Sequence, residues 1–515
     1  MSKTAKAAMS LMIVTMCSKV LGFVREMVLG ATYGTTGIAD AYVTAMNIPT
    51  VIFALIGSAL ATSYIPLYTE VNQNEGKEKA LKFSNNILSI VIILGAIISI
   101  LGIVFTQPIV KLFAIGYAGE KLELTIQFTK ILFLSVPFIG ATYIIKSYLE
   151  SQGDFITPGI NGFPYNIIII ITIILSAKTN VYVLAWGALL GVMSQFLIQV
   201  PSSLKRGYKY KFKPNIKDKN LNKMLILIAP ILVGASINQF NALVDRKLAS
   251  TLVEGSVSAL NYANRLNQFV LGLFIVSITA VIYPLLANLS TQNNKEKFGE
   301  TISTSMNVVT LLVVPVSAGA MILSKPIVQV LFERGAFTSS ATEMTSMALI
   351  CYSLGLLAVG IRDVLTKGFY ALKDTKTPMK NGIIAVIVNI AFNVLLIKKL
   401  EIAGLALATS ISGIVAMCLL YKDLRKKVSN LDEKSIFMTL LKTIISAIIM
   451  SIATLYTYNT ISSIMEIGKI GTILSLGISV LVGALIYGIM IIILKVDCAK
   501  FVIDKVKSKL IKSSK

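Results

Sequence analysis

The stretch from Asn241 to Pro284 reads NALVDRKLASTLVEGSVSALNYANRLNQFVLGLFIVSITAVIYP and sets charged residues between long apolar runs. Asp245, Arg246, Lys247 and Arg265 all lie in it. An ionisable side chain held at membrane depth costs about 2.5–3.5 kcal/mol on insertion scales, so it usually faces a protein-lined or water-filled cavity. The stretch therefore predicts one half of a binding cavity inside a membrane domain.

The chain of 515 residues is too hydrophobic for a soluble protein, with 55% apolar residues, 14% charged residues and a mean hydropathy of +0.77. About fourteen apolar stretches have the length that a bilayer requires, which predicts an all-α polytopic membrane protein. The predicted spans are 8–32, 38–66, 82–106, 124–149, 158–177, 181–203, 223–250, 257–289, 299–324, 341–372, 379–398, 402–421, 437–459 and 469–494.

The net charge of +23 does not indicate a nucleic-acid partner, because the basic residues gather in short connections between apolar runs. The densest of these connections runs from Ser202 to Lys223. Basic connections follow the even-numbered spans, and the positive-inside rule places them, with both termini, in the cytoplasm. They would also attract anionic membrane lipids. The tail 496–515 is predicted to be a basic amphipathic helix on that surface, or alternatively a frayed, solvated end.

An internal repeat divides the chain. Three pairs of segments match: YVTAMNIPTVIFALIGSALATSYIP from Tyr42 with YANRLNQFVLGLFIVSITAVIYP from Tyr262, PIVKLFAIG from Pro108 with PIVQVLFERG from Pro326, and SYLESQGDFITP ending at Pro158 with GFYALKDTKTP ending at Pro378. The offsets between paired landmarks are all 218 or 220 residues. Because six spans separate the copies, both would enter the membrane from the same side, as in a parallel repeat.

The repeat predicts five regions. They are an N-terminal lobe of six spans (1–204), a basic cytoplasmic linker (205–222), a C-terminal lobe of six spans (223–425), two further spans (426–495) and the basic tail (496–515). A site between two such lobes, exposed alternately to each side of the membrane, is the expected arrangement for a transporter.

Two arginines are the leading candidates for substrate binding. Arg265 lies eight residues into its predicted span, about 12 Å below the start of the helix, where a guanidinium cannot easily reach the surface. A guanidinium binds phosphate through two hydrogen bonds and stays charged, so Arg25 and Arg265 would clamp a diphosphate. Lys19, in the same SKVLGFVRE segment as Arg25, is a further cavity cation. The alternatives are structural: Lys19 would snorkel, and each arginine would only pair with a nearby carboxylate.

A coupling-ion site is a second hypothesis. Asp245, Asn389, Asn393 and Thr409 offer the carboxylate, amide and hydroxyl oxygens that a hard cation such as sodium takes. Asn389 and Asn393 are four residues apart and so share one helical face. Alternatively, Asp245 only neutralises an arginine and the two amides only bridge helices. The chain has no histidine and its four cysteines lie far apart, which argues against a transition-metal site.

No Walker loop, catalytic triad or nucleotide fingerprint occurs, so a transporter without a cofactor is expected rather than an enzyme, and ATP is not the expected energy source. A sodium gradient or the membrane potential, about 2.3 kcal/mol per charge per 100 mV, would supply the bias.

Five segments of the chain together match a known family: SKVLGFVREMVLGATYG, ADAYVTAMNIP, LVDRKLASTLVEGSVSALNYANRLNQFVLGLF, VLFERGAFT and GFYALKDTKTP. Through these segments the sequence resembles the MurJ (MviN) family of lipid II flippases, in the multidrug/oligosaccharidyl-lipid/polysaccharide (MOP) exporter superfamily. The resemblance implies fourteen helices, two six-helix lobes around a cationic cavity, and two final helices that form a groove for the lipid tail. The implied substrate is undecaprenyl diphosphate carrying a disaccharide pentapeptide, moved from the inner to the outer leaflet of the bacterial cytoplasmic membrane by alternating access.

By motif, Arg25 and Arg265 match the family arginines that bind the headgroup, Asp40 matches the acid of the ADAY motif, and Lys19 stands where many members have arginine. After Pro49 the family commonly has an arginine-rich stretch, whereas this chain reads TVIFALIG and so lacks one expected cavity cation. The expected partner is lipid II, and the chain is expected to act as a monomer.

Three other functions stay open. The first is a flippase for another polyprenyl-diphosphate glycan, and the second is a cation-coupled exporter of cationic drugs. The third is a membrane glycosyltransferase or ligase. An exporter of cationic drugs would need an acidic, aromatic cavity. The arginines embedded in the predicted spans argue against this function. The enzyme would need an acidic metal or base site and a large outer loop, and the sequence shows neither.

Overall fold

The computed structural model describes residues 3–428, 430–465 and 468–496, and every regular element in these ranges is a helix. The predicted tail helix lies outside them. The helices are α1 (Lys3–Tyr33), α2 (Gly37–Glu75), α3 (Lys77–Val104), α4 (Thr106–Phe113), α5 (Gly119–Phe133), α6 (Val136–Ser151), α7 (Ile156–Ile160), α8 (Gly162–Ser176), α9 (Val183–Leu197), α10 (Val200–Lys205), α11 (Lys219–Ala249), α12 (Ser256–Thr291), α13 (Lys295–Ile322), α14 (Ser324–Phe332), α15 (Ser339–Ala371), α16 (Lys376–Arg425), α17 (Glu433–Ile464) and α18 (Lys469–Ile493).

The described chain forms two compact units. The first contains the residues up to Ser258 together with Arg334–Phe337, and the second contains Ala259–Glu333 and the residues from Thr338 onward. The linker 205–222 and helix α11 therefore group with the first unit. The lobe boundaries at 204 and 223 stay a prediction.

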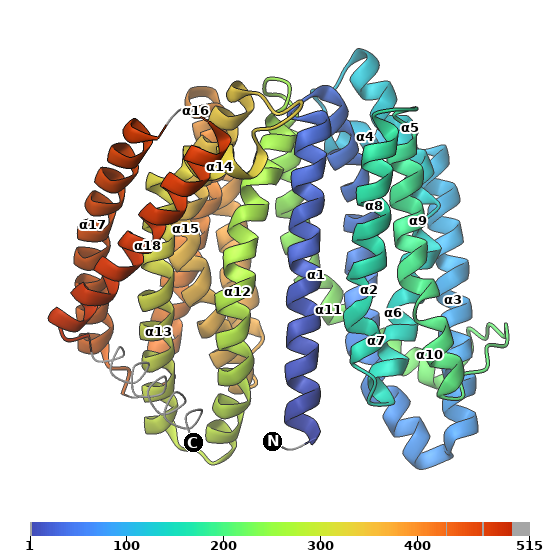
Figure 1. Cartoon of the computed structure of the whole chain (residues 1–515). Helices are drawn as coiled ribbons and strands as arrows, with labels where there is room; N and C mark the ends of the chain where they lie inside the picture. The colour runs from blue at the N-terminus through green and yellow to red at the C-terminus, as the bar shows by residue number, and fades with distance from the viewer. Residues whose placement is uncertain (1–2, 429, 466–467, 497–515) are drawn as a thin grey trace. The chain divides into compact units, whose positions relative to one another are not determined.

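Helices α2, α3 and α6 build the core of the first unit. Tyr64, Phe83 and Tyr148, one from each helix, are buried in a single hydrophobic cluster. The rings of Tyr64 and Phe83 stack with their centroids 5.9 Å apart, which adds specific packing to the burial of apolar area. Outside this core, α8 packs against both α1 and α9 (Figure 1).

The second unit packs α13 against α15 and α17, and α17 against α18 (Figure 1). Phe298 of α13 and Phe369 of α15 are buried in its main hydrophobic cluster. The hydroxyl of Tyr487 donates to the carbonyl oxygen of Leu311 at 2.8 Å and so ties α18 to α13. This buried hydrogen bond gives the C-terminal helix pair a fixed place on the second unit.

Helix α16 is two arms rather than one rod. Its backbone breaks at Glu401, where φ is 46° and ψ is −121°. The side chains of Asn389 and Thr409 lie 3.4 Å apart although twenty residues separate them, whereas a straight helix would hold them about 30 Å apart. The chain therefore doubles back at Glu401, and its arms correspond to the predicted spans 379–398 and 402–421.

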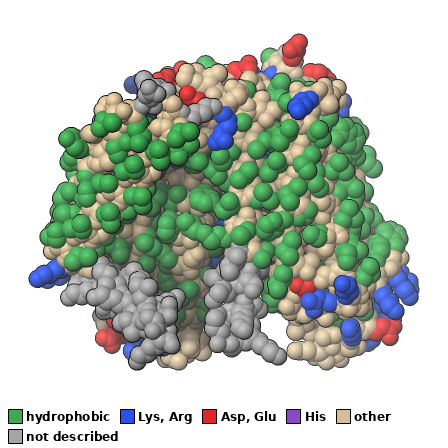
Figure 2. Space-filling view, in the orientation of Figure 1, with side chains coloured by type: hydrophobic (Ala, Val, Ile, Leu, Met, Phe, Trp, Pro, Cys, Tyr) green, Lys and Arg blue, Asp and Glu red, His purple; other side chains and the backbone are tan. Residues whose placement is uncertain are grey.

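Nine described helical segments are long and apolar enough to cross a membrane, or ten if α5 and α6, bent by 42°, form one span. The all-helical, multi-span prediction is thus confirmed, and the count of fourteen only in part. Among the helices outside the nine, α1, α2 and α11 each contain ionisable residues. Large apolar side chains cover the flanks of the helices, as Figure 2 shows for one face.

Candidate functional site

Arg25 is held between two helices of the first unit. Its Nη1 donates to Oδ1 of Asn166 on α8 at 3.1 Å, and its Nη2 pairs with Oε1 of Glu26 at 2.6 Å. The guanidinium carbon lies 5.4 Å from the centre of the Tyr165 ring. With 14% of its side chain exposed, this cation is offset by a carboxylate, an amide and an aromatic face.

Asn166 is itself fixed in place. Its Nδ2 donates to the carbonyl oxygen of Gly162, one turn earlier on α8, at 2.7 Å. This bond orients the amide so that its oxygen points at Arg25, since an amide has its donors and its acceptor on opposite sides. Helix α8 therefore presents one oriented acceptor to α1.

Lys19 lies on α1 and is exposed. It precedes Arg25 by six residues, so the two side chains leave the helix in directions about 120° apart. The structure does not bring Lys19 and Arg25 to one face of α1.

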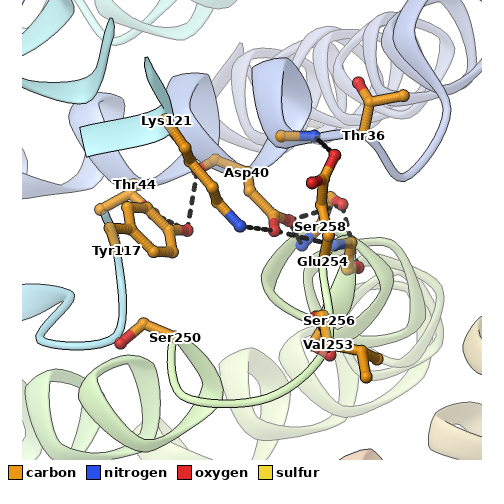
Figure 3. Close-up of polar contacts among 12 residues, drawn as sticks. Thr36, Asp40, Thr44, Tyr117, Lys121, Ser250, Val253, Glu254, Ser256 and Ser258 are labelled. Atoms are coloured by element: carbon orange, nitrogen blue, oxygen red, sulfur yellow. Dashed lines mark hydrogen bonds and ion pairs between the residues drawn. The ribbon is translucent and has the colours of Figure 1, made fainter. Parts of the chain in front are cut away.

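Asp40 is a buried carboxylate of the first unit, and both of its oxygens accept hydrogen bonds (Figure 3). Its Oδ2 accepts from Nζ of Lys121 at 2.6 Å and from the backbone N–H of Gly255 at 2.9 Å. Its Oδ1 accepts from both the N–H and the hydroxyl of Ser258, each at 2.8 Å. Only 1% of Asp40 is exposed, so its carboxylate contacts protein donors rather than water. These hydrogen bonds connect α2 to α5 and to the first turn of α12.

A second carboxylate, that of Glu254, also contacts α2 near Asp40. Oε1 of Glu254 accepts from the N–H of Gly37, the first residue of α2, at 2.5 Å, where a negative charge is favoured by the helix dipole. The next residue, Gly255, has a φ of +88°, and a Cβ there would lie 2.2 Å from the carbonyl oxygen of Thr35. A side chain at 255 would thus meet both a strained backbone and a clash.

Arg265 lies in the second unit, on α12, and is exposed. Its exposure agrees with a cation that meets a ligand or water. The clamp formed by Arg25 and Arg265 stays a prediction.

Three of the four predicted ion ligands lie together because α16 doubles back. Nδ2 of Asn389 contacts Oγ1 of Thr409 at 3.4 Å, and Nδ2 of Asn393 donates to Oδ1 of Asn389 at 2.7 Å. Both amides are fully buried. The fourth candidate, Asp245, is a half-buried residue of α11 in the first unit. The sodium site therefore stays a prediction, supported by a buried cluster of amide and hydroxyl groups.

Three residues of the site, Asn166, Lys121 and Ser258, were not predicted from the sequence. Asn166 could have been found, because it is an amide directly before the apolar run IIIIITIIL, and isolated amides in such runs usually bridge helices. Lys121 and Ser258 carry no local signal. Their contacts with Asp40 span 81 and 218 residues and depend on the fold.

Comparisons with known proteins agree with this description. A model of the family described as lipid II flippase MurJ matches residues 29–493. The probable lipid II flippase MurJ of Vibrio cholerae is 33% identical over 437 residues, which are 82% of this chain and 83% of the relative. The corresponding protein of Haemophilus influenzae is 31% identical over 502 residues, 94% of this chain and 98% of the relative.

Two solved structures share the fold. A lipid II flippase MurJ in an inward closed conformation is 29% identical, with a TM-score of 0.80 over 93% of this chain and 97% of the other. An inward-facing multidrug resistance MATE family transporter of the MOP superfamily is 16% identical, with a TM-score of 0.71 over 82% of this chain and 99% of the other. At that identity the second likeness concerns the fold alone.

Proposed function

Because this chain belongs to the MurJ family of lipid II flippases, and so is a membrane transporter rather than an enzyme, we propose the following transport step. It moves undecaprenyl diphosphate with its disaccharide pentapeptide from the inner to the outer leaflet of the bacterial cytoplasmic membrane by alternating access. The observation that carries the proposal is the Arg25 guanidinium, held at the α1–α8 contact by Glu26 and Asn166.

The pairing of Arg25 with Glu26 suits a group that binds and releases an anion. An unpaired guanidinium within a helix bundle would be costly, so a resident carboxylate stabilises it when no substrate is bound. A diphosphate would replace Glu26 as the partner and bind through two hydrogen bonds. Because one anion replaces another, the cation is never left alone, and release stays feasible. Arg265 would supply the second positive charge.

We propose fourteen spans in two six-helix lobes plus two C-terminal helices that hold the lipid tail. The ten candidate spans, the second arm of α16, and α1, α2 and α11 together support this number. The lobes would be residues 1–204 and 223–425, joined by 205–222. The chain would act as a monomer. The basic connections after even-numbered spans support an orientation with both termini in the cytoplasm.

Asp40 would act by fixing a conformation. Its Oδ2 accepts from Lys121 and Gly255, and its Oδ1 accepts from Ser258. Asp40 would therefore hold α2 against the start of α12 in one state and release it in another. Loss of these hydrogen bonds would weaken one state of the transport cycle without touching the headgroup.

A sodium ion held by Asn389, Asn393, Thr409 and Asp245 would couple transport to the ion gradient. We expect sodium to raise the melting temperature of the purified protein, because a ligand that binds the folded state stabilises it. The shift should be smaller in Asp245→Ala. Equal shifts in this variant and the parent would remove Asp245 from the set of ligands.

The function is tested by complementation in bacteria depleted of their own flippase. We expect Arg25→Ala and Arg265→Ala to insert normally and yet fail to support growth, because each removes a cation that meets the diphosphate. Arg425→Ala is the matched control, since Arg425 also pairs with one carboxylate, Glu433, but is 63% exposed at the end of α16. Full rescue by both site variants would contradict the clamp.

A further inference from the structure

The linker between α10 and α11 is fixed to the first unit along its length. We call residues 206–218 the strap. Nδ2 of Asn85 on α3 donates to the carbonyl oxygen of Lys209 at 2.9 Å. Asn86 exchanges two hydrogen bonds with the backbone of Asn215, at 2.6 and 3.0 Å. Both amides are buried, so α3 provides the non-helical strap with the partners that its backbone needs.

Two further contacts hold the strap between these points. The Tyr208 side chain is buried, and its ring centre lies 4.8 Å from that of Tyr148. The N–H of Lys213 donates to Oγ of Ser89, also on α3, at 3.3 Å. The strap is therefore a built surface of the first unit and not a loose connection.

The outward side of the strap mixes cations with large apolar groups. Lys209, Lys211, Lys213 and Lys217 are all exposed. Among them, Phe212 is 60% exposed and Ile216 is 77% exposed. The one acidic residue of the strap, Asp218, is the N-cap of α11, where its side chain accepts from two backbone N–H groups. The outward surface of the strap is thus strongly positive and also exposes large hydrophobic side chains.

The strap lies next to the start of a membrane-facing surface. Ser89 contacts the strap, and the first large exposed apolar residue after it on α3 is Ile93, only four residues or about 6 Å farther along the helix. From Ile93 onward, α3 exposes apolar residues through Val104. A basic segment with exposed aromatic and aliphatic groups at this level matches the interface between headgroups and acyl chains.

We propose that the strap is a binding site for anionic phospholipid headgroups. Lys209, Lys211 and Lys213 contact the headgroup phosphates, and Phe212 and Ile216 insert among the upper parts of the acyl chains. An acidic protein partner fits less well, because it would not account for apolar side chains at the level where the exposed flank of α3 begins. The assignment to the inner leaflet rests on the proposed flippase topology; lipid binding itself does not.

The test uses the full-length protein in nanodiscs of phosphatidylcholine and phosphatidylglycerol, with the lipids retained on extraction counted by native mass spectrometry. We expect the parent to retain phosphatidylglycerol preferentially and the triple variant K209Q/K211Q/K213Q to lose that preference about threefold or more. The control K373Q/K376Q/K380Q removes three exposed lysines of the second unit and the same charge. We expect it to behave like the parent.

Two outcomes of the lysine substitutions would overturn the proposal. Retention that is equal in all three proteins would show that the strap binds no lipid, and equal loss in both triple variants would show a bulk charge effect. The variant F212S/I216S keeps the net charge, and we expect it to lower retention as well. If it does not, and inorganic phosphate competes with the lipid, the strap is only a surface for anions.

A protein partner would leave lipid retention intact in K209Q/K211Q/K213Q while impairing growth of the complemented cells. An unchanged melting temperature confirms that each variant is folded. Failure of the flippase itself would appear in the Arg25 and Arg265 complementation and leave lipid retention on the strap unaffected.

Discussion

The turn that precedes α7 in the first unit and the turn that precedes α16 in the second each depend on an aspartate at the equivalent position of the repeat. Asp154 accepts from the N–H and hydroxyl of Thr157 at 3.1 and 2.8 Å, and Asp374 accepts from the same groups of Thr377 at 3.0 and 2.6 Å. The matching residues lie 220 positions apart, the offset of the repeat. The repeat in the sequence therefore encodes one turn twice, because Asp favours a hydrogen bond to the N–H a few residues ahead.

The two turns differ in what surrounds the carboxylate. Asp154 also accepts from Ser202 at 2.7 Å and pairs with Arg206 at 3.1 Å, and its side chain is only 6% exposed. Asp374 has Lys427 as its cation, and 16% of its side chain is exposed. Each unit thus completes the shared turn with a cation that lies just past the end of a later helix, Arg206 after α10 and Lys427 after α16. The turn follows from its local sequence, and the cation follows from the fold.

The largest effect expected from this comparison is on stability. Asp154→Ala removes the acceptor that Ser202, Thr157 and Arg206 share and should lower the free energy of unfolding by about 2–3 kcal/mol. Asp374→Ala removes fewer and more exposed partners and should lower it by about 1–2 kcal/mol. Unfolding in detergent measures both. A larger loss at Asp374 would break the comparison.

Titration of the same two carboxylates should make the stability of the protein depend on pH. Although burial raises the pKa of Asp154, hydrogen bonds from Ser202 and Thr157 and the Arg206 charge outweigh it and lower this pKa from 3.8 to about 2. A lowered pKa in the folded state stabilises the protein above the unfolded value, and this contribution is lost as the pH falls from about 4 to about 2.

The pKa of Asp374 is also lowered: burial opposes the shift, but bonds from Lys427 and Thr377 prevail. We expect the melting temperature of the parent to fall more steeply over this pH range than that of Asp154→Asn. Parallel curves for the two proteins would show that Asp154 does not titrate in this way.

The smallest effect concerns the residue before each carboxylate, which has a positive φ in both turns: 78° at Gly153 and 59° at Lys373. A Cβ at 153 would meet no atom within 4 Å, so Gly153→Ala should lower stability through the backbone alone, by about 1 kcal/mol. Lys373→Gly relieves the strain and should raise stability by about 0.5 kcal/mol, since a freer unfolded chain offsets part of the gain. Thermal unfolding of both variants checks the opposite signs.

Some features of the fold and of the site could be predicted from the sequence, and others could not. The apolar runs and the repeat predicted the helical membrane fold, and the predicted spans 379–398 and 402–421 correspond to the two arms of α16. The arginines were singled out because a charge in an apolar run is a strong local signal. The partners of Asp40 and the docking of the strap on Asn85 and Asn86 were not predicted. They join residues more than 80 positions apart, and the local sequence around an amide or a lysine does not specify which distant residue it will contact.

The central claim is that this chain carries a polyprenyl-diphosphate precursor across the membrane with the help of Arg25. The most direct measurement is the fraction of lipid II that a membrane-impermeant hydrolase can reach from outside, in cells depleted of their own flippase. We expect the parent chain to restore this fraction and Arg25→Ala to leave the precursor inside. Restoration by Arg25→Ala to the level of the parent, or no restoration by the parent itself, would contradict the account.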